Sequence, residues 1–307
     1  MAAASMLAAL TACGVKRTAA VPFPRQDLIA EIQDFQKTLG FEEQENFRSY
    51  SETRKAYYRC YYTGKLELPE SYERLKLAEG SAAGCALDEE NYDVFFYPME
   101  AAASGSAPVT ESLTEAPLER LLVVVPHEDF HNQSETENAA PEIAEAASTL
   151  IGFLTASEFA RGKYGGDSAT SLSLHREAGL FLEKARVVNG YFDRLRELYA
   201  ALRARRISRE AALERKRALF LQLEQECAAI TPEPVSFNRC PGALNNAALG
   251  FERTYSRYYP LLYEFSAAQG QDASATVAAL KRLLAARPRS EPELVSALRA
   301  SVRPGGG

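Results

Sequence analysis

The sequence has no tryptophan, only three methionines and only three histidines among its 307 residues. It has no apolar run of the ~18 residues that a membrane-spanning helix needs, so we expect no transmembrane segment. It also lacks a basic excess: the formal net charge is -6 and the pI is near 5.4, which argues against a nucleic-acid surface. Hydrophobic residues at 46% and charged residues at 25% are typical of a globular protein with a sizeable core.

Two of the three histidines, His127 and His131, frame an H-E-x-x-H motif. On a helix, positions i and i+4 share a face, so both imidazoles can point at one metal ion. Glu128 is the next residue round the helix, from where it can reach a water on that metal as a general base. Asp129 points away from this face. We expect it to be solvated or, at best, to contact a metal ligand and not the metal itself. The alternative is a pair of surface histidines on a solvated helix.

The segment before the motif leaves its secondary structure open. Residues 121–125 are all apolar, and Pro126 stands directly before His127. A proline inside a helix removes one backbone hydrogen bond and kinks the helix. The run could therefore be a strand followed by a helix that starts at Pro126, or part of one kinked helix from Pro117 to about Gln133. We favour the kinked helix, because H-E-x-x-H motifs in zinc peptidases lie inside longer helices.

A catalytic zinc usually has three protein ligands, so a third ligand is needed. We expect a helix from Pro141, and on it Glu145 lies among small residues that permit close helix packing. We favour Glu145, since the helix dipole already accounts for a carboxylate in the first turn, at Glu142. The remaining candidates are Glu135, Glu137, Glu158 and His175, the last of which we expect at the surface.

These residues predict one Zn²⁺ ion held by His127, His131 and Glu145. The reaction would be peptide-bond hydrolysis by a metal-activated water, with Glu128 as the general base. A tyrosine could stabilise the oxyanion, but the fifteen tyrosines leave the choice open.

The N-terminus suggests a location. Residues 1–12 are rich in Ala and Leu and lead into Cys13-Gly14, which resembles the end of a bacterial lipoprotein signal peptide. We therefore expect lipidation of Cys13 and attachment to the bacterial cell envelope, facing the periplasm, with membrane contact through the lipid anchor only. The outer membrane is favoured because residue 14 is Gly and not Asp. No Lys or Arg precedes the apolar run, as a signal should have, and a start codon placed too far downstream would explain this. The alternative is an Ala-rich tail with an incidental cysteine.

Four further cysteines are available for disulfides, namely Cys60, Cys85, Cys227 and Cys240. In an oxidising compartment they could form two bridges, and proximity favours Cys60–Cys85 and Cys227–Cys240. None has the C-x-x-C spacing of a cysteine zinc site, and the alternative is four buried thiols.

The expected fold is mainly α with a small β-sheet. We expect a strand over residues 92–98, a strand or helix over 57–62, a charged helix over 71–80, and a small-residue loop over 101–116 that could lie along a cleft. The remaining expected helices cover residues 27–39, 141–161, 171–205 with a possible break near Asn189-Gly190, 208–230, 244–269, 273–286 and a last one from Ser290.

We therefore expect a zincin-like α+β core followed by a long helical hairpin and C-terminal helices. Residues 1–24 would be signal and tether, 25–302 a single peptidase domain that is helical from about residue 171, and 303–307 a disordered tail.

By these motifs the chain resembles the bacterial predicted aminopeptidases, gluzincin-like H-E-x-x-H zinc peptidases that are often lipoproteins. Residues 144–152 match the family segment that carries the third ligand, with Glu145, Thr149 and Gly152 in register. Residues 245–249 followed by Tyr255 match a further family segment. The resemblance therefore implies that Asn245, Asn246 and Tyr255 lie at the cleft, although a turn or helix cap would also explain the asparagine pair.

The chain departs from the family at Asp129-Phe130, where Leu-Ala is usual, at Ala144, where Asn is usual, and in the small residues 101–105. The proposed zinc ligands are retained, while the departures lie near the cleft and bear on the substrate. The resemblance implies a peptide substrate and aminopeptidase activity. Two alternatives stay open: a non-catalytic helical lipoprotein that binds a partner or a cell-wall component, and a zinc hydrolase acting on another amide. The oligomeric state is not predicted.

Overall fold

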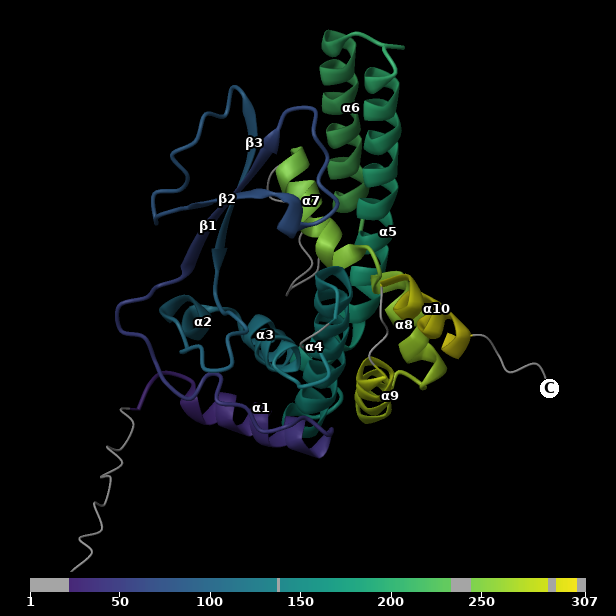
Figure 1. Cartoon of the computed structure of the whole chain (residues 1–307). Coiled ribbons are helices and arrows are strands. Elements are labelled where there is room, and N and C mark those ends of the chain that lie inside the picture. The colour runs from purple at the N-terminus through teal and green to yellow at the C-terminus, as the bar shows by residue number, and fades with distance from the viewer. Residues whose placement is uncertain (1–21, 137–138, 233–243, 287–290, 303–307) are drawn as a thin grey trace, which may run out of the picture.

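The computed structural model describes residues 22–136, 139–232, 244–286 and 291–302 (Figure 1). It is mainly helical with one small antiparallel sheet, which confirms the expected fold class. No helix within those ranges is both long and apolar enough to cross a bilayer. Cys13, Glu137, Cys240 and the tail 303–307 lie outside the described residues.

The sheet has three strands in the order β2-β1-β3. Strand β1 is Tyr57–Gly64, β2 is Lys76–Glu79 and β3 is Tyr92–Met99. The aromatic segment that could have been helix or strand is therefore a strand, paired in register Cys60↔Phe96 with β3 and Cys60↔Ala78 with β2.

The helix expected over residues 71–80 is wrong. Only the 3-10 turn η1, Tyr72–Arg74, is helical there, and β2 follows it directly. Charged residues are common on edge strands, where they discourage pairing with other chains. Lys76 and Glu79 are exposed on such a strand, so their charge did not indicate a helix face.

The first expected disulfide is present. Cys60 in β1 is bonded to Cys85 in the connection between β2 and β3. Cys227 is also disulfide-bonded. Cys240, the partner expected for it, is outside the described residues.

The motif lies in a group of four helices: α1 (Gln26–Thr38), α2 (Glu111–Glu115), α3 (Leu118–His131) and α4 (Pro141–Tyr164). Helix α2 interrupts the loop expected over residues 101–116. Helix α3 is continuous through Pro126, so the expectation of one helix is confirmed and the strand alternative is wrong. All of residues 121–127 are buried, and this burial holds the motif helix in the interior.

The C-terminal half is helical throughout its described part. Helices α5 (Ala169–Arg203) and α6 (Arg209–Ala228) form the expected hairpin, which projects from the body (Figure 1). Helix α5 continues through Asn189-Gly190, and the Ser208 hydroxyl caps α6 by accepting a hydrogen bond from the Ala211 N–H.

One helix was expected over residues 244–269, but two are present, α7 (Asn246–Ser256) and α8 (Tyr259–Ala268). Pro260 sits in the first turn of α8, where proline is tolerated and where it favours a new helix start. Helices α9 (Ala273–Ala285) and α10 (Glu291–Val302) are the last elements of the described residues.

The main hydrophobic core lies around α3 and α4 and is closed by α1, α8, α9 and α10. A second cluster fills the hairpin, and a third joins the sheet to α7 through Phe95 and Phe251. Helix α7 therefore lies between the sheet and the hairpin (Figure 1). This position brings the N-terminal sheet and the C-terminal helices to the motif.

Candidate metal site and cleft

The motif helix α3 and the following helix α4 approach each other very closely. A Cβ atom at Gly152 of α4 would lie 2.9 Å from the backbone oxygen of Val123 and 3.3 Å from the Cβ of His127. Only glycine accommodates this contact without a backbone shift. This close packing also brings Glu145, in the second turn of α4, next to the two motif histidines.

The side chains of His127, His131 and Glu145 converge on one point. The His131 Nε2 lies 3.0 Å from the Glu145 Oε2 and 3.2 Å from the His127 Nε2, and the His127 Nε2 lies 3.3 Å from the Glu145 Oε2. All three potential ligand atoms lie within 4.8 Å of one another. Two imidazole nitrogens and one carboxylate oxygen are a ligand set typical of a catalytic zinc, so these residues fit the expected ion.

The charges of the three groups are coupled. Burial lowers the pKa of His127. Burial would also lower the pKa of His131, but the carboxylate of Glu145 outweighs it and raises that pKa. Burial would raise the pKa of Glu145, yet the two imidazoles hold it well below its usual range. Glu145 is therefore ionised and available as a ligand.

The orientation of the ligands depends on groups in their surroundings. The Thr149 hydroxyl on α4 lies 3.4 Å from the His127 Nδ1, the ring nitrogen that does not face Glu145. The Tyr72 hydroxyl donates a hydrogen bond of 3.1 Å to the Glu145 Oε1. Partners of this kind fix the ring and carboxylate orientations of metal ligands.

Glu128 lies beside the three candidate ligands but does not belong to the converging group. It lines the same cleft as His127 and His131. Burial raises its pKa to about 8. A carboxyl group whose pKa is near neutrality is suited to accept a proton and to pass it on.

Two tyrosines complete the wall beside the ligands. The ring of Tyr255, on α7, stacks on that of His127 with an interplanar angle of 24° and a centroid distance of 6.3 Å. Burial raises the pKa of Tyr255 and of Tyr72 above the usual range, so both phenols stay protonated and can donate. Tyr255 was expected at the cleft. Tyr72 was missed, because it lies 73 residues before its partner Glu145 and no spacing in the sequence links the two.

The ligands open into a cleft of about 1040 Å³. Two segments line the cleft, residues 42–44 and residues 102–105, and we call each of them a rim. Glu128 and the three converging side chains line the same cleft. The small-residue segment therefore lies along the cleft as expected.

Asn245 and Asn246 do not line this cleft, so the expectation for this pair is wrong. The side chain of Asn245 caps α7 by accepting a hydrogen bond of 3.0 Å from the Ala248 N–H, which confirms the cap alternative. It also donates a 2.8 Å hydrogen bond to the Val94 carbonyl. The backbone N–H of Asn246 donates to the buried carboxylate of Asp93 at 2.8 Å.

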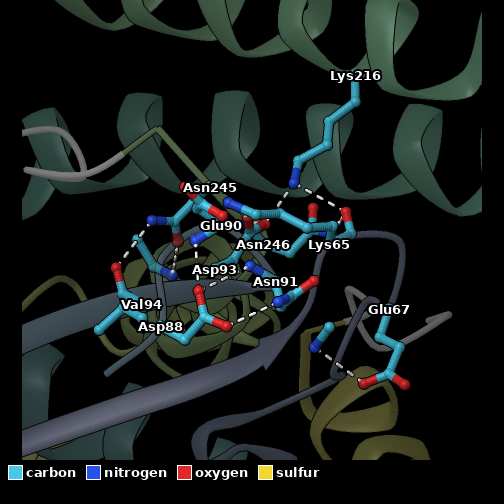
Figure 2. A network of polar contacts seen from close by, with 12 residues as sticks. Lys65, Glu67, Asp88, Glu90, Asn91, Asp93, Val94, Lys216, Asn245 and Asn246 are labelled. Carbon is cyan, nitrogen blue, oxygen red and sulfur yellow. Dashed lines mark hydrogen bonds and ion pairs between the residues drawn. The ribbon is translucent and has the colours of Figure 1, made fainter. Parts of the chain in front are cut away.

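Asp93 is the centre of that network (Figure 2). Its carboxylate forms ion pairs with Lys65, at 3.3 Å, and with Lys216 of α6. The network joins β3, α6 and the start of α7. It thereby positions the helix that carries Tyr255.

The other candidate residues lie elsewhere. His175 is exposed on α5, as expected. Glu135 pairs with Lys281 at 3.3 Å, Glu142 pairs with Arg257 at 3.8 Å, and Glu158 accepts a hydrogen bond of 2.9 Å from the Ala273 N–H. Asp129 does face away from the ligands, but it is buried rather than solvated. Burial raises its pKa to about 7.

A family model described as "Putative aminopeptidase" matches residues 72–294. The chain belongs to this family. The matched stretch includes Tyr72, the motif, Glu145 and Tyr255, and family membership suggests peptidase activity. Comparison with curated proteins and with solved structures finds no match.

Proposed function

We propose that this protein is a zinc-dependent aminopeptidase with a single zinc ion. The observation that carries the proposal is the convergence of His127, His131 and Glu145 within 4.8 Å on two closely packed helices. Membership in the family supports a peptidase. Zinc, when bound there, would polarise the scissile carbonyl and lower the pKa of a water.

The remaining chemistry belongs to the side chains around the ligands. Glu128 accepts the proton of the attacking water and transfers it to the leaving amine. Its position next to the ligands, and its raised pKa of about 8, suit both transfers.

The two tyrosines take different roles. The Tyr72 hydroxyl is engaged with Glu145 at 3.1 Å, so we assign it to holding the ligand carboxylate in place. Tyr255 lines the cleft beside His127, and we assign its phenol to the oxyanion that develops on the scissile carbonyl. Such a donor must lie in the cleft wall near the candidate metal site, and Tyr255 lines the cleft beside His127.

The charge of the cleft favours substrates with a free amino terminus. Glu42 and Glu43 lie on one rim and are paired outside the cleft lining, Glu43 with Arg48 at 2.7 Å and Glu42 with Lys281 at 3.9 Å. The described residues that line the cleft include no lysine or arginine. A carboxypeptidase would need a cation there to hold the substrate's terminal carboxylate. The described lining carries carboxyl groups and no cation, and this balance favours an ammonium group.

We further propose that the enzyme acts on the periplasmic side of a bacterial cell envelope, attached through lipidated Cys13, with the outer membrane favoured. The Cys60–Cys85 disulfide supports an oxidising compartment, because such bridges are rare in reducing cytosol.

The proposal is tested with matched peptides that carry a free or an acetylated amino terminus. The wild type should release the first residue of the free peptide and leave the acetylated peptide intact. Glu128→Gln should bind the same amount of zinc and lose about 10²–10⁴-fold in rate, the range for loss of general acid–base catalysis.

Equal cleavage of both peptides would contradict the aminopeptidase assignment and indicate an endopeptidase. A zinc-free protein without hydrolytic activity would instead support the alternative, a helical lipoprotein that binds a partner or a cell-wall component.

A further inference from the structure

The last turn of the motif helix is joined to both rims of the cleft by side-chain amides. Four residues make these connections, and we call them the carboxamide clamp: Gln33, Asn46, Asn132 and Gln133. Because a carboxamide has a donor at one end and an acceptor at the other, it can join a carbonyl of one segment to an N–H of another.

Asn132 connects the general base to the rim of small residues. Its Nδ2 donates a hydrogen bond of 3.1 Å to the backbone carbonyl of Glu128. Its Oδ1 accepts one of 3.1 Å from the backbone N–H of Gly105. Gly105 has a positive φ of 74°, a conformation that glycine adopts readily, so the hydrogen bond holds a turn that would otherwise be free to change.

Gln133 makes the equivalent connection to the other rim, residues 42–44. Its Nε2 donates a hydrogen bond of 2.9 Å to the backbone carbonyl of Asp129. Its Oε1 accepts one of 2.7 Å from the backbone N–H of Glu42 and one of 3.2 Å from Lys281. Gln133 is only 1% exposed, so water does not compete for these bonds.

Gln33 and Asn46 add a third connection, through the buried side chain of Asp129. The Gln33 Nε2 donates to the Asp129 Oδ2 at 3.2 Å and to the backbone carbonyl of Asn46 at 3.0 Å. The Asn46 Oδ1 accepts a hydrogen bond of 2.9 Å from the Ala107 N–H. This connection ends just beyond the rim that Asn132 holds.

We propose that the carboxamide clamp fixes both cleft rims to the motif helix, and that Asn132 and Gln133 are positioning residues for substrate binding. Both bond to carbonyls of α3 and not to the metal-binding side chains. Their loss should therefore let the rims move while the ligand geometry is kept. The part of the inference that concerns substrate rests on the proposed peptidase function.

The mechanical part is tested by hydrogen exchange on the full chain, with no metal and no substrate. Asn132→Leu and Gln133→Met keep the approximate side-chain volume and remove the side-chain hydrogen bonds, two for Asn132 and three for Gln133. Asn132→Leu should raise exchange at Gly105 about tenfold and leave Glu42 unchanged, and Gln133→Met should do the reverse. Gln222→Ala, at an exposed position on α6, is the control and should change neither amide.

The functional part uses the same variants with the peptide that has a free amino terminus. Each clamp variant should keep wild-type zinc content and raise KM about tenfold, with kcat changed less than threefold. Unchanged exchange at the two rim amides would overturn the clamp, whether or not the protein is a peptidase. Raised exchange with an unchanged KM would overturn the positioning role. If the wild type hydrolyses no peptide, the proposed function fails and the exchange experiment still decides the clamp.

Discussion

Gly152→Ala tests whether the close approach of α3 and α4 builds the site. The added methyl group would lie 2.9 Å from the Val123 carbonyl oxygen, which is backbone and cannot rotate away. Alanine favours a helix over glycine by ~1 kcal/mol, while overpacking costs ~1–3 kcal/mol. We therefore expect a net loss of up to about 2 kcal/mol in the free energy of unfolding.

The matched control is Gly162→Ala in the same helix. No atom lies within 4 Å of the position that its Cβ would take, so this variant gains helix propensity without a clash. Because the propensity gain is common to both variants, their difference isolates the clash, at ~1–3 kcal/mol. At ~2–4 °C per kcal/mol, the melting temperatures of the two variants should differ by roughly 2–12 °C.

The same substitution should weaken zinc binding. The methyl group would also lie 3.3 Å from the His127 Cβ, so relief of the clash must move His127 relative to Glu145. Thermal unfolding of both variants and zinc competition with a chromophoric chelator measure the two effects. If Gly152→Ala has the same melting temperature as Gly162→Ala and binds zinc as tightly as the wild type, the close approach of the two helices does not determine the site.

Three further predictions concern the surroundings of the cleft. Asp93→Ala leaves buried Lys216 without its carboxylate, so the free energy of unfolding measured by urea denaturation should fall by ~3–5 kcal/mol. A decrease below ~1 kcal/mol would mean that the pair is not effectively buried. Asn245→Ala removes the α7 cap and should lower the free energy of unfolding by ~1 kcal/mol in the same assay. It should reduce kcat/KM for the peptide with a free amino terminus less than threefold, and a hundredfold reduction would mean that Asn245 acts at the cleft after all. Tyr255→Phe should lower kcat by about 10²-fold and leave the zinc content unchanged, whereas Tyr72→Phe should mainly lower the affinity for zinc. The opposite result would mean that the two tyrosines have each other's role.

The convergence of the three candidate ligands could be predicted because it depends on local rules. The spacing of His127 and His131 puts them on one helix face, and the small residues around Glu145 indicate a close helix contact. The helix could continue through Pro126 because residues 121–127 are buried, and this packing outweighs the loss of one hydrogen bond.

The remainder depends on contacts between segments far apart in the chain. Tyr72 meets Glu145 only after α7 packs against the loop before η1, where a Cβ at Gly250 would lie 2.9 Å from the Pro69 carbonyl oxygen. Asn245 and Asn246 carry cap and network roles that a motif match does not distinguish from cleft roles. The buried Asp129 side chain is hydrogen-bonded to Gln33, which only the packing of α1 brings to α3.

The most direct test of the metal site is the zinc content of the purified protein under metal-replete conditions, compared with His131→Ala, Glu145→Ala and Glu142→Ala. Glu142 pairs with Arg257 and is the matched control for a carboxylate on α4. We expect one zinc per chain in the wild type and in Glu142→Ala, and a loss of at least tenfold in affinity in the other two. Absence of stoichiometric zinc from the wild type, or full retention by Glu145→Ala, would contradict the proposed site.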